Sequence, residues 1–488
     1  MNFRVLWLTL LCVLAPHLCH SQTITLNEFL QKVRQTHPFF VKESLSVEIE
    51  AKAQEQYLGA QDWNLSASPF FSHQKPIGTS LFDPQRIDVV GTELAAEKAL
   101  WNTGGKFSLS WSSQFSDQKL PDIVIPTPSG IMDIPTGPVE FYQHKIYLTY
   151  SQPLWQNYKG TLDRLEYELS QYNIDFTEVQ ALENKEIFLV DLATRFLDWA
   201  LITDQIRIAN ERTRLAQEEL ERTIKKRKAY LVDQVDVLRA EDAVRIAKQN
   251  VVLLEAQWKS LQAELSVLCQ SPEVCDKEPE FELYKLVALP SVQEVSSQLR
   301  EQSRILRTLN IRREQLLHLQ DGYTEQGRPE LFLNVGAGLR GGDDEFAGSL
   351  ELDKPDMSVS LLFRYPLENR TAQASIAKTD LEIQQLDQEV ENIALDLEAS
   401  VVNLLVFIKE MEKVLALNEE QITSAQAKTE EELHLYNQGR GDLTFVILGR
   451  DNEQQAKLTY AQNSASYQKL LLQYRALMDE FLVVEEED

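Results

Sequence analysis

Apolar residues recur at alternating intervals of three and four between Val237 and Leu268, over more than four heptads. This spacing is typical of a coiled-coil seam. A second row, from Val446 to Leu477, can be laid on the first position by position, and most positions keep the same character. The chain therefore contains this unit twice.

The N-terminal parts of the two copies also correspond, at a wider offset. Here Leu26 is laid on Val292 and Glu28 on Glu294. Because this offset exceeds the one that lays Val237 on Val446, the first copy is longer in its middle. One long unit is thus duplicated, which argues against two unrelated domains.

Each copy begins with a helical pattern and continues with alternating residues. The first pattern covers residues 23–61, with an N-cap near Thr25 or Asn27 and a break at His37-Pro38. Apolar and polar residues then alternate, which predicts strands with one wet face. The alternating runs are Phe107–Phe115, Ile146–Tyr150, Leu331–Leu339 and Met357–Tyr365.

These runs approach the ten or so residues that a tilted strand needs to cross a bilayer. Aromatic residues near their ends are placed like an interfacial girdle. They are Trp63, Trp101, Trp155, Tyr158 and Tyr365. A soluble sandwich could show the same alternation, so strands alone do not identify a membrane protein.

A long helical stretch follows the strands in each copy, to about Lys228 in the first and to Gln438 in the second. In the second, apolar residues from Leu386 to Leu415 are spaced by about 3.6, which predicts a nearly straight helix. A second apolar row lies beside them, at Val402, Leu405 and Phe407. Two apolar flanks suit a helix with a neighbour on each side, as in a hollow cylinder.

Each copy therefore reads helix, strands, very long helix, tight turn, shorter helix. This order resembles the TolC family of outer-membrane efflux channels, over nearly the whole mature chain. The motifs that carry the resemblance are Gln152-Pro153-Leu154 and Tyr365-Pro366-Leu367 after a strand, Pro329 before one, and Tyr436-x-x-Gly439 at a hairpin turn. The chain departs from the family at Trp63, where proline is usual, and in its longer first copy.

The resemblance implies an α+β membrane protein. Three identical chains would close one transmembrane β-barrel in the outer membrane of a Gram-negative bacterium, continued by a long periplasmic α-helical coiled-coil barrel. It also implies a periplasmic adaptor protein and an inner-membrane pump, of RND or ABC type, as partners, besides outer-membrane lipid. A physical argument supports the trimer. Open strand edges cannot be exposed in lipid, so a chain with only a few strands must close its barrel with other copies.

The number of strands depends on the longer first copy. Gly104-Gly105 marks a turn there, and the preceding segment Ile87–Trp101 reads as a strand, although Thr92–Leu100 also reads as a short helix. Four strands from the first copy and two from the second would give eighteen in a trimer, whereas the usual two and two would give twelve. We favour eighteen, with residues 121–138 as an external loop.

The chain divides into nine segments on this interpretation. They are a signal peptide (1–21), periplasmic helices (22–62), β-barrel strands with an extra hairpin (63–155), a long helical hairpin (156–270), a linker (271–290), and then, in the second copy, periplasmic helices (291–328), strands (329–368) and a long helical hairpin (369–482), before an acidic tail (483–488).

The signal peptide is read from Arg4, the apolar run Val5–Ala15 and a cleavage site after Ser21. Cleavage leaves Cys269 and Cys275, which we expect to form a short disulfide in an oxidising compartment. Two free thiols are the alternative. No later stretch is long and apolar enough for a transmembrane helix, so a membrane role would have to come from strands.

The net charge of the chain limits the classes of molecule that it is expected to bind. The net charge of −27 repels nucleic acid and argues against an anionic ligand. Partners should be neutral, cationic or protein, and a wet acidic lumen should favour cations.

No motif indicates an enzyme. The segment Gly336–Gly341 matches GxGxxG, but it runs on into Gly342-Asp343 instead of opening a helix, so a strand with small residues is the simpler interpretation. The histidines are scattered and none pairs with another at ligand spacing on a helix. We expect no cofactor, no metal site and no catalytic residues.

The hairpin turns are the candidate sites, because both expose apolar side chains at the end of a long hairpin. In the family, an adaptor docks there. The residues concerned are Leu231, Val232 and Val235 in the first turn and Gly439, Gly441 and Leu443 in the second. Local packing within the turn is the alternative for each of them.

The resemblance also implies a gate at these turns, where an aspartate bonds a tyrosine and an arginine. Asp236 and Tyr436 match two of these positions, whereas Gly441 occupies the arginine position and only the adjacent Arg440 could substitute. The family's two ring-forming aspartates fall at Phe445 and Leu448. We therefore expect an altered gate.

The leading hypothesis is an outer-membrane exit duct of a tripartite efflux or type I secretion system, which passively conducts substrate from an inner-membrane pump to the outside. The alternative is a periplasmic coiled-coil scaffold with β-sandwich insertions and no channel activity. The sequence leaves open the substrate and the pump class.

Overall fold

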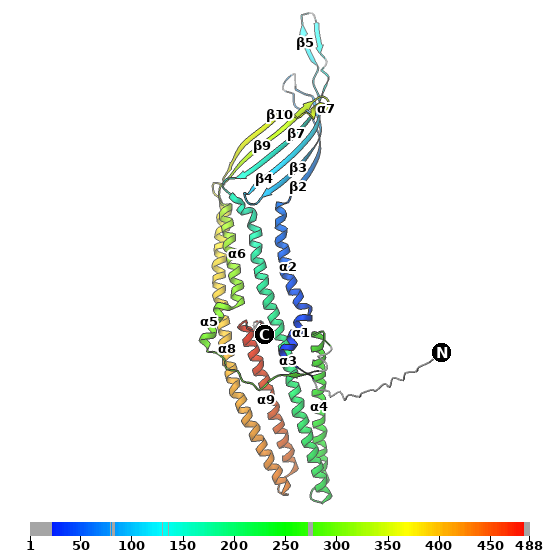
Figure 1. The fold of residues 1–488 in the computed structure, drawn as a ribbon, viewed down its shortest axis with the longest axis vertical. Coiled ribbons are helices and arrows are strands. Elements are labelled where there is room, and N and C mark those ends of the chain that lie inside the picture. The colour runs from blue at the N-terminus through cyan, green and yellow to red at the C-terminus, as the bar shows by residue number, and fades with distance from the viewer. Residues whose placement is uncertain are drawn as a thin grey trace, which may run out of the picture. The chain divides into compact units, whose positions relative to one another are not determined.

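The computed structural model describes residues 22–78, 80, 83–128, 130–134, 136–271 and 277–482. These residues form two compact units (Figure 1). Unit 1 comprises residues up to Ser44, Leu182–Arg304 and residues from Ala394 onward, and unit 2 comprises Leu45–Ala181 and Ile305–Ile393. The predicted signal peptide, the acidic tail and Cys275 lie outside the described residues.

The two helical hairpins repeat each other in length. Helices α3 (Thr161–Lys228) and α8 (Arg370–Asn437) have 68 residues each. Helices α4 (Gln234–Leu268) and α9 (Leu443–Leu477) have 35 residues each. Both helices of the second copy therefore begin and end at the positions that correspond to those of the first, as the repeated seam predicted.

The shorter helices repeat as well. Helix α1 (Leu26–Thr36) is followed by α2 (Pro38–Leu58) and the 3₁₀ turn η1 (Gly59–Gln61), and α5 (Val292–Gln302) is followed by α6 (Arg304–Gln326). Capping boxes open α1 and α5. The Thr25 and Ser291 side chains accept from the amides of Glu28 and Glu294, and the side chains of these glutamates accept from the amides of Thr25 and Ser291. The predicted cap at Thr25 and break at His37-Pro38 are confirmed.

The core of unit 1 lies where α1 packs against α3 and α4, and its largest buried side chains include Phe29, Phe196, Trp199 and Leu265. Two short strands border it. Strand β1 (Gln22–Thr25) pairs in parallel with β8 (Lys277–Glu280), a segment of the linker.

The sequence predicted no such strands, since it assigned Thr23 to a helix. Pairing decides their conformation: Ile24 is completely buried in the core, and the Thr23 hydroxyl donates to Glu280 at 2.6 Å. Four-residue strands carry too few residues for periodicity to reveal them.

An arginine at the start of α6 ties three helices together in unit 1. The Arg304 guanidinium donates to Glu183 of α3 at 3.2 Å and lies 3.1 Å from Asp479, just after α9, and it also pairs with Glu186. Burial, and then the Asp479 charge, raise the pKa of Glu183. These three carboxylates converge closely enough to hold a metal ion, but Arg304 supplies the positive charge among them.

Unit 2 contains a six-stranded antiparallel sheet in the order β10-β9-β7-β4-β3-β2. The strands are β2 (Asn64–Gln74), β3 (Arg86–Leu100), β4 (Gly105–Lys119), β7 (Pro138–Pro153), β9 (Glu330–Asp343) and β10 (Lys354–Arg364). Four come from the first copy and two from the second, as favoured above. Residues Thr92–Leu100 belong to β3 and not to a helix.

Two small elements adjoin this sheet along the chain. Strands β5 (Ile123–Thr127) and β6 (Gly130–Ile134) pair with each other, within the segment expected to be an external loop. The short helix α7 (Phe346–Ser349) lies between β9 and β10. None of the helices in the described part of the chain carries an apolar stretch long enough to span a membrane.

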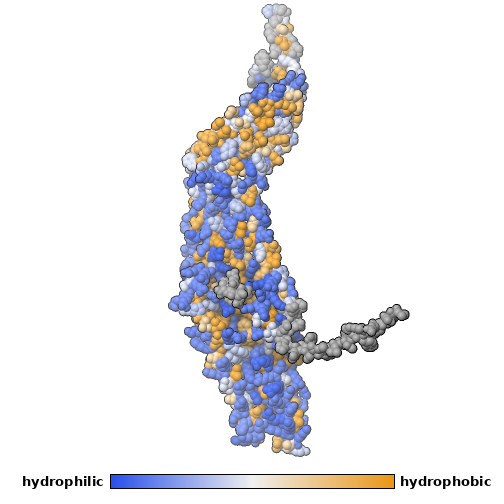
Figure 2. Space-filling view, in the orientation of Figure 1, coloured by the Kyte–Doolittle hydropathy of each residue, from blue (hydrophilic) through white to orange (hydrophobic). Residues whose placement is uncertain are grey.

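The register of the sheet separates an apolar face from a polar one. Leu94, Trp111, Ile146 and Leu339 are successive partners across four strands, on the apolar face. The adjacent row, on the other face, runs Ala95, Ser110, Tyr147 and Gly338. Figure 2 shows hydrophobic residues gathered over the strands of this unit. The predicted period of two is therefore real on both copies' strands.

The GxGxxG segment lies within β9, which continues to Asp343, so it opens no helix. Its glycines are explained by the neighbouring strand. The Tyr147 ring lies over Gly336 and Gly338, and its hydroxyl is 2.5 Å from Ser358 Oγ on β10. A side chain at either glycine would overlap that ring.

One apolar row of α8 is buried and part of the other is exposed. In unit 1, Val401 and Ile408 are buried, whereas Val402 and Phe407 are exposed by 38% and 57%. Leu405, which we placed in the second row, is buried with the first. The exposed row remains available to a neighbouring molecule.

We predict that Gly338→Val destabilises unit 2 by about 1–3 kcal/mol, because the new side chain would meet the Ile146 carbonyl and the Tyr147 ring. The matched control is Ala337→Val, one residue earlier and exposed on the apolar face. Thermal unfolding followed by circular dichroism checks both. Equal midpoints for the two variants would contradict this explanation of the glycine.

Candidate functional site

The two hairpin turns close by the same hydrogen-bonding pattern. In turn 1 (residues 229–233), the Tyr230 amide donates to Arg227 and the Leu231 amide to Lys226, both at 3.0 Å. In turn 2 (residues 438–442), the Gly439 amide donates to Tyr436 at 3.2 Å and the Arg440 amide to Leu435 at 3.0 Å. Both are Schellman motifs, which satisfy the last carbonyls of a helix.

The residue at the left-handed position of the motif differs between the turns. Gly439 has φ of 74° and Tyr230 has φ of 60°. This backbone conformation costs a glycine little and is uncommon for a bulky residue. The Tyr230 side chain is 88% exposed, so packing against the described residues does not explain its presence.

The two turns line one groove of about 1020 Å³. Its walls carry charges of both signs, from Lys226, Asp233, Asp236, Arg440 and Asp442. An open groove with mixed charge suits a polar protein surface better than a small apolar ligand.

Within the single chain, Asp236 and Tyr436 bond to other partners and not to each other. Asp236 belongs to the capping box of α4: its carboxylate accepts from the Asp233 amide at 3.3 Å and from Arg239 at 3.2 Å. An acidic residue in the first turn of a helix is drawn to these local donors. Its two oxygens are therefore already engaged.

Tyr436 finds its partners on α3. Its side chain is buried, its hydroxyl lies 3.4 Å from the Thr223 hydroxyl, and Lys226 Nζ lies 3.5 Å above its ring. Burial raises the pKa of Tyr436, and the Asp236 charge adds to the effect while the Thr223 hydrogen bond opposes it. Arg440 is exposed and has no carboxylate within 4.0 Å among the described residues.

The expected docking residues separate into exposed and packed groups. Leu231 and Val235 are exposed by 73% and 53%. Leu443 is only 2% exposed and packs with Tyr436, and Val232 packs against the same cluster, so the expectation that Leu443 is exposed is wrong. Gly439 supplies the left-handed turn, and Gly441 lies so close to Leu435 and Tyr436 that a side chain would not fit.

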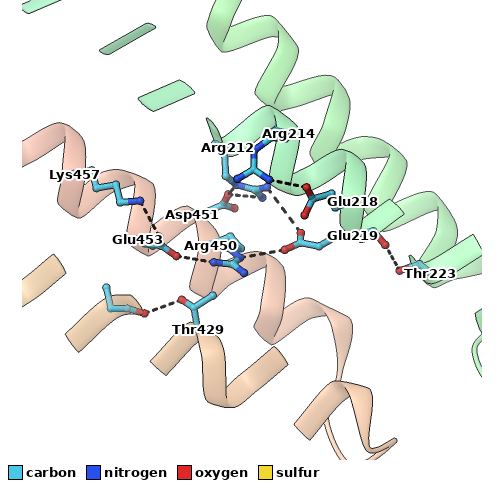
Figure 3. A network of polar contacts seen from close by, with 11 residues as sticks. Arg212, Arg214, Glu218, Glu219, Thr223, Thr429, Arg450, Asp451, Glu453 and Lys457 are labelled. Carbon is cyan, nitrogen blue, oxygen red and sulfur yellow. Dashed lines mark hydrogen bonds and ion pairs between the residues drawn. The ribbon is translucent and has the colours of Figure 1, made fainter. Parts of the chain in front are cut away.

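A buried ion network links α3 to α9 (Figure 3). Arg450 donates to Glu219 of α3 at 3.3 Å and to Glu453 of its own helix at 2.9 Å. Arg212 lies across the same interface and donates to Asp451 at 3.0 Å. The side chains of Arg212, Glu219 and Glu453 are 4%, 6% and 7% exposed, so these charges depend on one another.

Two carboxylates of this network shift in opposite directions. Burial raises the pKa of Glu219, although Arg212 and Arg450 oppose it. Burial also acts to raise the pKa of Glu453, but Lys457 and Arg450 outweigh it, and the net shift is downward. Glu453 has Lys457 at 2.9 Å in addition to Arg450, which accounts for the difference.

Four of the five residues of the predicted girdle are exposed in the single chain, and the girdle itself stays a prediction. Trp63, Trp155, Tyr158 and Tyr365 are exposed by 53%, 48%, 52% and 41%. Trp101 is 6% exposed, because its ring packs on Tyr167 and its carbonyl accepts from Arg164, so its assignment to the girdle is wrong.

The predicted Cys269–Cys275 disulfide stays a prediction, because Cys275 lies outside the described residues. The Cys269 side chain is buried in the core of unit 1, and burial raises the pKa of its thiol to about 11. A thiol in this environment is a poor nucleophile.

Comparison with known proteins gives the fold. No protein-family model and no curated protein matches the chain. Solved structures do match: CusC with a TM-score of 0.65 and 11% identity, over 93% of this chain and 91% of CusC. The outer membrane protein VceC of Vibrio cholerae gives 0.63 and 10%, over 93% and 95%.

The Campylobacter jejuni CmeC outer membrane channel also matches, with a TM-score of 0.62 and 12% identity, over 93% of this chain and 85% of CmeC. At these identities the matches establish a shared fold. At that level they confirm the resemblance to the TolC family of outer-membrane channels.

Sequence reasoning missed three features of this site: the ion network, Tyr230 and the basic residues that precede it. A signal for the network was present, since Glu453 stands on the apolar seam where the first copy has Val244. A charge on a seam requires a buried partner. The contribution of α3 to the network could not be identified, because Glu219 is far from Arg450 in sequence.

We predict that Arg450→Met destabilises unit 1 by about 3–5 kcal/mol, because it leaves Glu219 and Glu453 buried with fewer partners. The control is Arg214→Met, which removes an exposed pair with Glu218 one turn away on α3 and should cost about 0.5 kcal/mol or less. Chemical denaturation measures both. Similar costs would show that burial does not govern the network.

We also predict that Asp236 and Tyr436 act independently. Asp236→Ala should cost about 0.5–1.5 kcal/mol through loss of its hydrogen bond in the capping box, and Tyr436→Phe about 1 kcal/mol or less through loss of one long hydrogen bond. In a double-mutant cycle on thermal unfolding the two costs should add to within about 0.5 kcal/mol. A larger coupling energy would indicate that Asp236 and Tyr436 interact directly, as the expected gate requires.

Proposed function

We propose that this chain, which has the fold of outer-membrane channels, is the outer-membrane exit duct of a tripartite efflux or type I secretion system. It would conduct substrate passively, without chemistry, from an inner-membrane pump of RND or ABC type through the periplasm to the outside of a Gram-negative bacterium. A periplasmic adaptor protein would join it to the pump at the hairpin turns.

The observation that carries the proposal is the two-faced sheet with two free edges. Side chains of β10 on the apolar face are largely exposed, at 79% for Met357, 72% for Val359 and 63% for Leu361. A surface of this kind in water promotes aggregation, whereas in a bilayer it is matched by lipid. The polar face, with Ser110 and Tyr147, would then line a wet lumen.

The free edges support assembly from several copies. Strands β2 and β10 lie at opposite edges of the sheet, and backbone groups on their outer sides need partners in lipid. Because all six strands are antiparallel neighbours, the β10 of one copy can continue with the β2 of the next in the same alternation. Three copies would close an eighteen-stranded barrel, within the range of about 8–26 known for such barrels.

The helices support the same arrangement. The exposed row of α8, with Val402 and Phe407, offers a contact to a neighbouring copy beside the contacts that α8 makes in its own chain. The net charge of −27 would give the lumen an acidic character, which lowers the barrier for cationic substrates.

Paired substitutions on β10 test the proposal. Val359→Arg places a charge on the proposed lipid face, and should reduce the trimer recovered from detergent-extracted membranes about tenfold or more, since such a charge costs about 2–4 kcal/mol at mid-membrane. Ser360→Arg places the same charge on the proposed lumen face and should leave recovery unchanged. Both positions are exposed in the single chain, so burial within it cannot explain a difference.

The wild-type protein should migrate as a heat-modifiable trimer and conduct ions in planar bilayers. A soluble monomer without conductance would favour the periplasmic scaffold instead. Equal recovery of the two arginine variants would contradict the proposal that the apolar face of the sheet lies in the membrane.

A further inference from the structure

The end of α3 carries the most basic segment of an acidic chain. Residues 222–239 contain six basic and two acidic residues, whereas the matching window of the second copy, 431–448, contains one basic and three acidic residues. Five of the basic residues form what we call the basic collar: Arg222, Lys225, Lys226, Arg227 and Lys228. The two turns, equal in length and backbone, therefore differ in charge.

Helix stability does not account for the collar. Cations in a last turn stabilise the helix dipole by about 0.3–1 kcal/mol each, and one or two would serve. Helix α8 is also 68 residues long and ends with the same motif, yet the basic residue in its last turn is His434 alone. The duplication thus provides an internal control, which shows that this hairpin closes without a collar.

The collar is costly in the isolated chain. Among the described residues, Lys225, Arg227 and Lys228 have no carboxylate within 4.0 Å. Lys226 is directed to Tyr436, where it donates to the carbonyl at 2.8 Å. Burial, and then repulsion from Arg222, lower the pKa of Lys226. Such crowding of like charges is destabilising, and an acidic partner would relieve it.

Tyr230 is the second, independent observation. It occupies the left-handed position where Gly439 stands in turn 2, and it is the only aromatic residue among the described non-glycine residues with positive φ. Its side chain and that of Leu231 project from the turn, 88% and 73% exposed. A strained, exposed aromatic residue with no partner in its own chain suits an anchor at an interface.

We infer that turn 1, through Tyr230 and Leu231 surrounded by the basic collar, is the dominant docking point of the chain, and that it receives a protein segment with an apolar stripe flanked by carboxylates. Turn 2 is not equivalent to it. This inference rests on the proposed function and specifies the chemistry of the partner expected at the turns.

An anionic membrane is the other surface that a basic collar could meet, and the neighbouring turn argues against it. Glu430 and Glu431 are exposed at the end of α8, and Glu432 and Asp442 line the same groove as Lys226. A uniformly anionic surface would repel these carboxylates while attracting the collar. A protein partner can present both signs in the required order.

Three variants of the full-length protein test the inference. Tyr230→Gly removes the anchor and relieves the backbone, so its unfolding midpoint should equal or exceed that of the wild type. Lys225→Glu/Lys228→Glu reverses two exposed charges of the collar, and Glu430→Lys/Glu431→Lys is the matched reversal at turn 2. The probes are a labelled helical peptide with a leucine stripe flanked by glutamates, its lysine-flanked twin, and phosphatidylglycerol vesicles.

We expect the wild type to bind the glutamate peptide in preference to its twin, more weakly when salt is raised from about 0.1 to 1 M, because this shortens the screening length from about 10 to 3 Å. Tyr230→Gly and Lys225→Glu/Lys228→Glu should each lose about tenfold in affinity or more, the loss expected for an interface anchor. The reversal at turn 2 should bind as tightly as the wild type.

Several results would overturn the inference. One is binding of both peptides alike, and another is unchanged affinity in the Tyr230 and collar variants. Binding to the vesicles that disappears with the collar would assign it to a membrane. Single-channel conductance of the same preparations separates this test from that of the duct: a conducting protein with no charge-dependent binding refutes only the docking chemistry, and a non-conducting one refutes the duct.

Discussion

Backbone hydrogen bonding at the two outer edges of the six-stranded sheet constrains the whole chain. Among the residues that the structure describes, strands β2 and β10 are paired on one side only, and they flank a sheet with one apolar face. Neither solvent suits both features. The apolar face is unfavourable in water, and the unpaired backbone groups of the edges are unfavourable in lipid. In the proposed assembly, other copies of the chain would meet both requirements, and the exposed row of α8 would face a neighbouring copy.

Local patterns predicted most of the elements. Alternation identified the strands, a cap near Thr25 or Asn27 marked the first helix, and the repeated seam fixed both hairpins. These features depend on neighbours within a few residues in sequence, which a single sequence displays. Trp101 shows the limit, because a tryptophan at a strand end has the same pattern whether it faces lipid or packs on Tyr167.

The features that escaped prediction depend on residues distant in sequence or on differences between the copies. The contacts of Arg450, Tyr436 and Ile24 come from other elements, and no local period reveals them. The sequence shows that Tyr230 aligns with Gly439. That both residues adopt the left-handed conformation was seen only from their φ angles. A duplicated chain therefore records its specialisation in the positions where the copies disagree.

Strand β1 has a consequence for how the protein is made. It pairs with β8, and the partners Gln22 and Lys277 are separated by the whole first copy. This contact cannot form until the linker has left the ribosome, and closing so long a loop is slow. The first copy thus remains unfinished until the linker that follows it has been synthesised.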